Sequence, residues 1–175
     1  HLVELHGGRV WAESPGLQRG STFTVELPLV TEPRAVIESL IALEGAPRLD
    51  GVHVLLVEDD VDAREMLRMM LIDAGATVST AHTAETALES NAADRPDVLV
   101  SDIGLPGRDG YALVRELREM ERRESTRTLP AIALTAFAAV DDRQRAFAAG
   151  FHFHLPKPVD PAYLVATVAH AARKR

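Results

Sequence analysis

From Gly51 onward the chain alternates short apolar runs with longer amphipathic segments, and this alternation restricts the fold more than any other feature. The apolar runs lack a clear polar–apolar alternation, which is typical of parallel strands buried on both faces. Strands that alternate with helices predict a doubly wound α/β fold around a parallel sheet. Five strands are expected, at Val52–Val57, Ala76–Thr80, Asp97–Ser101, Ala131–Thr135 and Phe151–Leu155.

The segments between these runs have the periodicity of helices with one apolar face. In the first segment, apolar residues recur at i, i+3, i+4, i+7 and i+8 from Ala63, and Gly75 is suited to end that helix. Thr83 can cap the next helix through its hydroxyl group. Further helices are therefore expected at 83–91, Tyr111–Arg122, Asp141–Ala149 and Asp160–Ala172.

The composition excludes several classes of protein. The net charge is −7, from 19 Lys and Arg against 26 Asp and Glu, which argues against a nucleic-acid partner or an anionic membrane surface. The chain has no cysteine, which excludes disulfides and cysteine-ligated metals and fits a reducing cytoplasm. No apolar run approaches the roughly 18 residues of a membrane span, and no signal peptide is recognisable. We expect a globular, cytoplasmic chain without direct membrane contact; the missing initiator Met indicates a piece of a longer protein.

The first 50 residues differ in character from the rest. Two strand-like runs, Arg9–Glu13 and Ser21–Leu27, flank a loop rich in turn residues, which predicts a β-hairpin. A piece of about 30 residues cannot bury enough surface to fold alone, so this hairpin is expected to need a larger sheet. Residues 31–50 are interpreted as a linker with one short helix at Ala35–Leu43.

Chemically active side chains follow four of the five expected strands. Because ligands of parallel sheets bind at the carboxyl ends of the strands, we expect Glu58-Asp59-Asp60, Asp102, Thr135 and Lys157 to share one edge. Each residue alone also fits a helix cap, a turn or a strand end, but their joint placement favours a site. Clustered carboxylates suit Mg²⁺, and a carboxylate beside a divalent ion can attack phosphorus. A hydroxyl group and an ammonium group can then stabilise the phosphoryl oxygens.

Residues 52–172 resemble the response-regulator receiver domains of two-component signalling, which have a flavodoxin-like fold. The resemblance is carried by four motifs in order along the chain. These are Val54-Leu55-Leu56-Val57-Glu58-Asp59-Asp60, Asp102 followed by Leu105-Pro106 and Asp109-Gly110, Leu134-Thr135-Ala136, and Lys157-Pro158.

This resemblance implies the chemistry of the acidic residues. Asp102 is expected to take a phosphoryl group from a phosphohistidine, supplied by a histidine kinase or a His-containing phosphotransfer protein. Mg²⁺ is expected to bind Glu58, Asp59, Asp102 and the backbone carbonyl of Gly104.

The resemblance also implies a switch. Thr135 is expected to turn inward to the phosphoryl group, and Lys157 to pair with Asp102 and then with its phosphate. The Lys157–Pro158 bond is expected to be cis. Three residues depart from the family pattern: Glu58 stands for an Asp, His154 occupies the position of an aromatic output switch, and Pro156 is expected to end the fifth strand early.

A second resemblance covers the first thirty residues. Leu5-His6-Gly7-Gly8-Arg9-Val10-Trp11-Ala12-Glu13-Ser14 and Gly20-Ser21-Thr22-Phe23-Thr24-Val25-Glu26-Leu27-Pro28 are similar to the C-terminal end of a histidine-kinase ATPase domain. No ATP-binding motif and no His-acceptor motif precede them, so we expect no kinase activity from this chain. The resulting hypothesis is the C-terminal part of a hybrid histidine kinase, with a membrane-bound parent left open. Its parts are a kinase remnant at 1–30, a linker at 31–50 and a receiver at 51–175.

Two other functions fit parts of the pattern. An aspartate-nucleophile phosphatase needs a second Asp two residues after the nucleophile, and this chain has Gly104 there. An interaction module that is not phosphorylated would not need Asp102, Thr135 and Lys157 together.

Overall fold

The structure is a computed structural model that describes residue 3 and residues 8–16, 19–27, 47–136 and 140–173. The expected helix at Ala35–Leu43 and most of the expected linker lie outside the described residues. The chain divides into two compact units, residues 1–35 and 36–175. Within the described part of the chain, no helix is long and apolar enough to cross a membrane.

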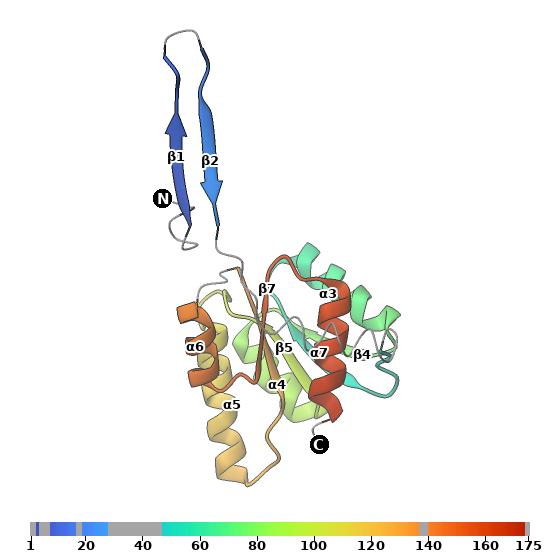
Figure 1. Cartoon of the computed structure of the whole chain (residues 1–175). Coiled ribbons are helices and arrows are strands. Elements are labelled where there is room, and N and C mark those ends of the chain that lie inside the picture. Colours follow the sequence, from blue (N-terminus) through green and yellow to red (C-terminus); the bar gives the residue numbers. More distant parts are fainter. Residues whose placement is uncertain (1–2, 4–7, 17–18, 28–46, 137–139, 174–175) are drawn as a thin grey trace. The chain divides into compact units, whose positions relative to one another are not determined.

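The described residues of the first unit contain a two-stranded antiparallel hairpin, as expected (Figure 1). Strand β1 (Arg9–Glu13) pairs with β2 (Thr22–Glu26), with Val10 opposite Val25 and Ala12 opposite Phe23. These four residues lie on one face, because side chains two residues apart point to the same side of a strand. That apolar face is open to solvent, and Phe23 is 75% exposed.

The second unit contains the predicted five-stranded parallel sheet, in the order β4-β3-β5-β6-β7. Its strands are β3 (His53–Val57), β4 (Thr77–Ala81), β5 (Val98–Asp102), β6 (Ala131–Thr135) and β7 (Phe153–Pro156). Its helices are α3 (Val61–Asp73), α4 (Ala84–Asp94), α5 (Gly110–Glu124), α6 (Val140–Ala149) and α7 (Pro161–Arg173). The chain runs outward from β3 to β4 and then returns to β5, so the strand order reverses between β3 and β5. Ligands of doubly wound sheets bind at such a point.

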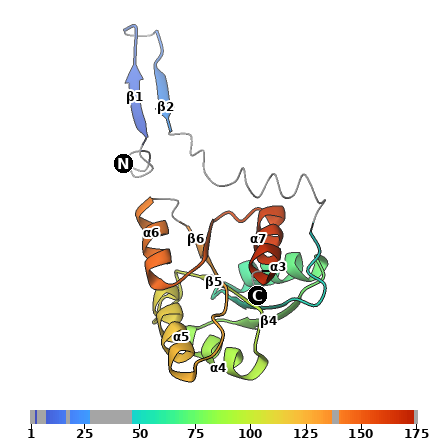
Figure 2. The same ribbon diagram turned by 60° about the horizontal axis from the view of Figure 1, so that its bottom comes forward.

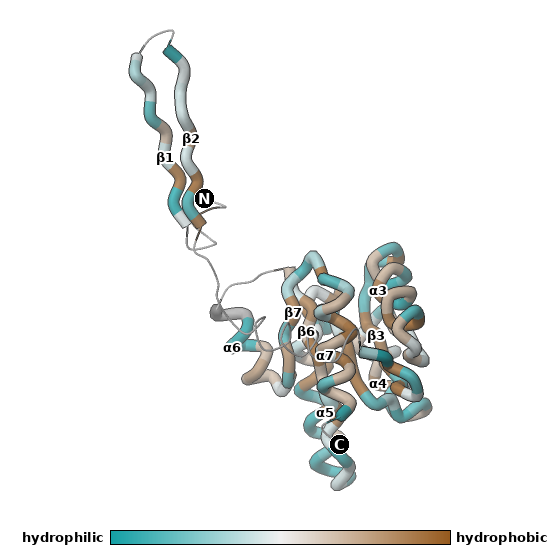
Figure 3. The backbone as a smooth tube through the Cα atoms, turned by 45° about the vertical axis from the view of Figure 1, so that its right-hand side comes forward, coloured by the Kyte–Doolittle hydropathy of each residue, from teal (hydrophilic) through white to brown (hydrophobic). Residues whose placement is uncertain are grey.

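Helices cover both faces of this sheet (Figures 1 and 2). Leu56 of β3 packs with α3 and α7 on one face, while its neighbour Leu55 packs with α4, α5 and α6 on the other. Both leucines are at most 1% exposed, and Figure 3 shows hydrophobic residues gathered along the strands. Burial on both faces explains why these strands have continuous apolar runs.

The predicted strand and helix positions are confirmed to within a few residues at most ends. Thr83 caps α4 in a capping box with Thr86, and Asp60 caps α3 by accepting a hydrogen bond of 2.8 Å from Ala63 N. Gly75 follows α3 with a φ of +103°, a conformation that favours glycine.

The expectation that Pro156 ends the last strand early is wrong. Strand β7 begins at Phe153 instead of Phe151 and includes Pro156, which pairs with Thr135. Lys157 N donates to Thr135 O at 2.7 Å. Because the backbone nitrogens of successive strand residues point to opposite sides, the nitrogen of Pro156 points away from β6. Because β7 is the edge strand, a proline there removes no hydrogen bond from the sheet.

Candidate functional site

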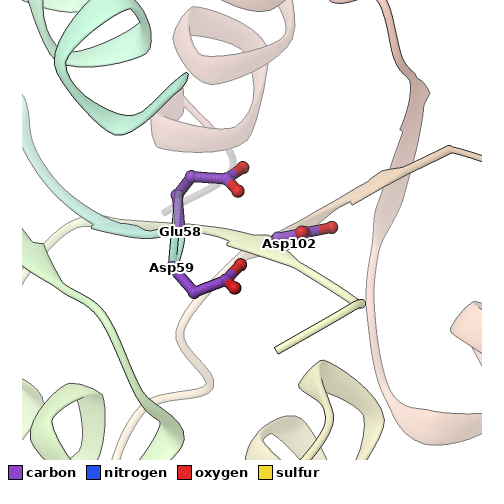
Figure 4. Close-up of side chains that lie close together, drawn as sticks. All are labelled: Glu58, Asp59 and Asp102. Atoms are coloured by element: carbon purple, nitrogen blue, oxygen red, sulfur yellow. The ribbon is translucent and has the colours of Figure 1, made fainter. Parts of the chain in front are cut away.

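Three carboxylates gather at the carboxyl edge of the sheet, beside the reversal of strand order (Figure 4). Glu58 and Asp59 follow β3, and Asp102 is the last residue of β5. One carboxylate oxygen of each residue lies within 4.8 Å of the other two. Glu58 is only 1% exposed and Asp102 8%, whereas Asp59 is exposed. The expected joint placement of these three residues is therefore observed.

Strand register brings the three carboxylates together. Val57 of β3 pairs with Ser101 of β5, so the next residues, Glu58 and Asp102, lie at the same level on neighbouring strands. Glu58 N donates to Ala81 O at 3.1 Å, which extends the β3–β4 pairing by one residue. Asp60 then starts α3 as its N-cap, so only two residues separate the strand from the helix cap.

Lys157, which directly follows β7, also reaches this cluster. Its Nζ atom lies 2.7 Å from Oε2 of Glu58 and 3.0 Å from Oδ2 of Asp102. The Lys157–Pro158 peptide bond is cis, as expected. The lysine therefore pairs with Asp102, as the family resemblance implies, and also with Glu58, which the sequence did not predict.

The electrostatics of the cluster favour the binding of a cation. Burial raises the pKa of Glu58, and the nearby Asp102 and Asp59 carboxylates act in the same direction against the hydrogen bond from Lys157. Burial alone lowers the pKa of Lys157, but its bonds to Glu58 and Asp102 outweigh this effect and raise it. Oxygen donors at this spacing suit a hard divalent ion such as Mg²⁺. The donor set therefore fits the expected metal.

Two glycines that follow Asp102 differ in the space around them. A Cβ atom on Gly104 would lie 3.5 Å from Oδ2 of Asp102, an ordinary contact, so a side chain there would stand next to the carboxylate. A Cβ atom on Gly110 would lie 2.4 Å from the backbone oxygen of Asp102, which no side chain can do. Gly110 N donates to Ile103 O at 2.9 Å, so the start of α5 packs directly against the end of β5.

The remaining expected site residues lie on β6 and β7. Thr135 is the last residue of β6 and 4% exposed, and its neighbour Leu134 pairs with Asp102. Thr135 therefore lies at the same edge of the sheet as the carboxylates. His154 pairs with Ala133, two residues before Thr135, in the strand that leads to Lys157.

Arg64 is a residue of this region to which sequence reasoning gave no role. Its Nη1 atom donates to the backbone oxygens of Glu58 at 2.7 Å and Asp59 at 3.1 Å. The only signal in the sequence is an arginine six residues after Glu58, near the start of the first helix, and a surface ion pair explains such an arginine equally well.

The chain resembles known receiver domains in sequence and in structure. Residues 54–169 match the model of the response regulator receiver domain family. A 14.6 kDa protein from the sodA1 3′ region of Leptolyngbya boryana is 47% identical over 120 residues, which cover 69% of this chain and 89% of that protein. Hybrid signal transduction histidine kinase D of Dictyostelium discoideum is 32% identical over 117 residues, which cover 64% of this chain but 8% of the kinase.

A solved structure gives the same result. The crystal structure of a protein from Chloroflexus aurantiacus J-10-fl, described as a response regulator, has a TM-score of 0.64 and 34% identity, covering 70% of this chain and 98% of that one. Fold, acidic site and sequence match thus agree over the same part of the chain. The chain belongs to the response regulator receiver family of two-component signalling.

Proposed function

We propose that Asp102 accepts a phosphoryl group from a phosphohistidine, with Mg²⁺ held by Glu58, Asp59, Asp102 and the backbone carbonyl of Gly104. The observation that carries this proposal is the meeting of three carboxylate oxygens within 4.8 Å beside a lysine. The three carboxylates carry more negative charge than Lys157 can neutralise, which favours the binding of a divalent cation; that cation would in turn offset the charge of an incoming phosphoryl group.

In the proposed reaction, one carboxylate oxygen of Asp102 forms a bond to phosphorus as the bond between phosphorus and the donor imidazole nitrogen breaks. The imidazole leaves with the electron pair of that bond. Bound Mg²⁺ supplies positive charge to the phosphoryl oxygens. Lys157 exchanges its contact with Asp102 for a phosphoryl oxygen and so offsets charge that develops during the transfer.

Phosphorylation then acts as a switch in this proposal. The hydroxyl group of Thr135 donates a hydrogen bond to the phosphoryl group. His154, at the position of the output switch, then changes its conformation. Along the chain, α6 lies between β6, which ends at Thr135, and β7, which contains His154, so we expect that helix to respond to the new charge. If the amide spectrum of Thr135 and α6 stayed unchanged when Asp102 carried a phosphate mimic, this switch would be excluded.

The hairpin supports a further part of the proposal, namely that residues 1–30 end a histidine-kinase ATPase domain, residues 31–50 are a linker and residues 51–175 are the receiver of a hybrid kinase. An isolated hairpin is at best marginally stable, and the apolar face of this one leaves Phe23 75% and Val25 53% exposed. The relative from D. discoideum is itself a hybrid kinase. In such a protein, the amides of β1 and β2 should exchange slowly with solvent in the whole kinase and rapidly in the present chain. Equally rapid exchange in both would refute this assignment.

Phosphotransfer tests the main proposal. A histidine kinase or phosphotransfer protein that carries a labelled phosphohistidine is mixed with the wild type or with Asp102→Asn, with and without Mg²⁺. We expect label on the wild type only with Mg²⁺, and none on the variant. Label on both proteins would reject Asp102 as the acceptor.

A further inference from the structure

We propose that Arg64 is a positioning residue, which orients the metal-binding carboxylates of Glu58 and Asp59 by holding the backbone that carries them. This inference rests on the proposed metal site, and it adds to that site a residue that touches neither the ion nor the phosphoryl group.

The contact joins the first helix to the loop before it. Arg64 lies near the start of α3, and its half-buried side chain turns back toward the end of β3. A single nitrogen, Nη1, donates to Glu58 O at 2.7 Å and to Asp59 O at 3.1 Å. Two successive carbonyl groups therefore point at one donor, which fixes the orientation of the two peptide planes that they belong to.

Fixing these peptide planes also fixes the side chains. Each carboxylate leaves the Cα atom next to a held carbonyl, so rotation of a peptide plane would carry its carboxylate with it. The other described hydrogen bonds lie at the two ends of the loop, where Glu58 N bonds to Ala81 O, the Glu58 carboxylate accepts from Lys157, and Asp60 caps α3. Asp59 lies between these ends and is exposed, so its orientation depends most on Arg64.

Loss of the Arg64 contacts should weaken the binding of Mg²⁺. Mg²⁺ requires a near-ideal arrangement of oxygen ligands, and groups that orient the ligands typically change metal affinity by 10-fold to 100-fold when they are removed. Without the guanidinium group, the two carbonyls would have to turn to other donors or to water, and the carboxylates would sample a wider range of separations.

Arg68 is a matched control on the same helix. It lies one turn further along α3 and donates from Nε and Nη2 to the carboxylate of Glu65, at 2.8 and 2.7 Å. Arg68→Met removes the same kind of side chain and the same charge from the same helix as Arg64→Met does. The described ion pair of Arg68 is on the surface, however, where such pairs contribute little to stability.

The test is a calorimetric titration of Mg²⁺ into the unphosphorylated wild type, Arg64→Met, Arg64→Lys and Arg68→Met. We expect Arg64→Met to raise the dissociation constant about tenfold. Arg64→Lys should recover part of the loss, since an ammonium group can still donate to a carbonyl, and Arg68→Met should match the wild type. Amide hydrogen exchange at Glu58–Asp60 should accelerate in Arg64→Met alone.

Phosphorylation by acetyl phosphate supplies a second readout, with the Mg²⁺ concentration varied. Arg64→Met should need more Mg²⁺ for half-maximal rate yet reach nearly the wild-type rate at saturation, whereas general damage to the fold would lower the maximal rate. If Arg64→Met does not fold, Arg64→Lys is used in its place, and we expect its dissociation constant for Mg²⁺ to be at least twice that of the wild type.

Equal Mg²⁺ affinity in the wild type and the Arg64 variants would overturn this inference and leave the proposed metal site standing. An equal loss in Arg68→Met would also overturn it, since charge alone would then explain the effect. A wild type that binds no Mg²⁺ would overturn both the metal site and the role of Arg64.

Discussion

Glu58 and Lys157 are 99 residues apart in sequence, yet Oε2 of the glutamate accepts a hydrogen bond of 2.7 Å from Nζ of the lysine. The Glu58 side chain is 2% exposed and that of Lys157 28%. The pair joins the end of β3 to the end of β7, across the two strands that lie between them. The same lysine contacts Asp102, so one ammonium group holds two of the three clustered carboxylates.

Removal of the ammonium group should destabilise the protein. Lys157→Met would leave the buried Glu58 carboxylate without this partner; breaking a fully buried ion pair typically costs about 3–5 kcal/mol, which is an upper bound here because the lysine is 28% exposed. The double variant Glu58→Gln/Lys157→Met should regain much of the unfolding free energy that Lys157→Met loses, because it also removes the unpaired charge of the Glu58 carboxylate. Urea unfolding of both single variants and the double variant measures this coupling; additive effects would contradict it.

The pH dependence of stability should reveal the burial of Glu58. Because burial raises its pKa in the folded protein above the usual 4.5, the wild type loses stability as the pH rises through the folded-state pKa. Glu58→Gln lacks this titration, so without Mg²⁺ the unfolding free energy of the variant minus that of the wild type should increase from pH 4 toward pH 8.

Glu65 is the control for this measurement. Its exposed carboxylate has a lowered pKa because of its hydrogen bond to Arg68, so the sign of its contribution is opposite. For Glu65→Gln, the same difference from the wild type should not grow with pH. The same growth in both variants would mean that the slope comes from the net charge of −7 and not from the site.

Addition of metal should stabilise the wild type. A ligand that binds only the folded state adds about 2.7 kcal/mol at a concentration 100 times its dissociation constant. We expect Mg²⁺ to raise the unfolding temperature of the wild type, and EDTA to reverse the rise. Asp102→Asn, which loses one carboxylate of the cluster, should respond much less at the same Mg²⁺ concentration. An equal response of the two proteins would place the ion elsewhere.

Gly110 should tolerate no side chain. The Cβ atom of Gly110→Ala would meet the backbone oxygen of Asp102 at 2.4 Å, so the start of α5 would have to move, at a typical cost of about 1–3 kcal/mol. Gly104→Ala is the matched control, because its Cβ atom makes only ordinary contacts near the Asp102 carboxylate. Thermal unfolding of the two variants compares them; a Gly104→Ala loss as large as that of Gly110→Ala would contradict this account.

The sheet and most of the site could be predicted because local patterns determine them. A strand buried on both faces needs an apolar run, and the order of helices and strands leaves few ways to arrange a parallel sheet. Once strand ends share one edge, residues that follow the strands must meet there. This is why the sequence alone groups Glu58, Asp59 and Asp102.

Features that depend on contacts across the fold could not be predicted in the same way. The extension of β7 through Pro156 depends on its place at the edge of the sheet, which removes the penalty that a proline has in a central strand. The bond of Glu58 to Lys157 joins side chains from the ends of two strands that are not neighbours, and the bonds of Arg64 depend on its side chain turning back toward the loop before α3. Side-chain reach of this kind is not visible in sequence spacing.

Intact mass measurement after incubation with acetyl phosphate and Mg²⁺ tests the central claim most directly, with wild type and Asp102→Asn side by side. We expect that the wild type gains the mass of one phosphoryl group, that EDTA prevents the gain, and that the variant gains none. A gain of the same mass in both proteins, or no gain in a wild type that binds Mg²⁺, would contradict the assignment of Asp102 as a working acceptor.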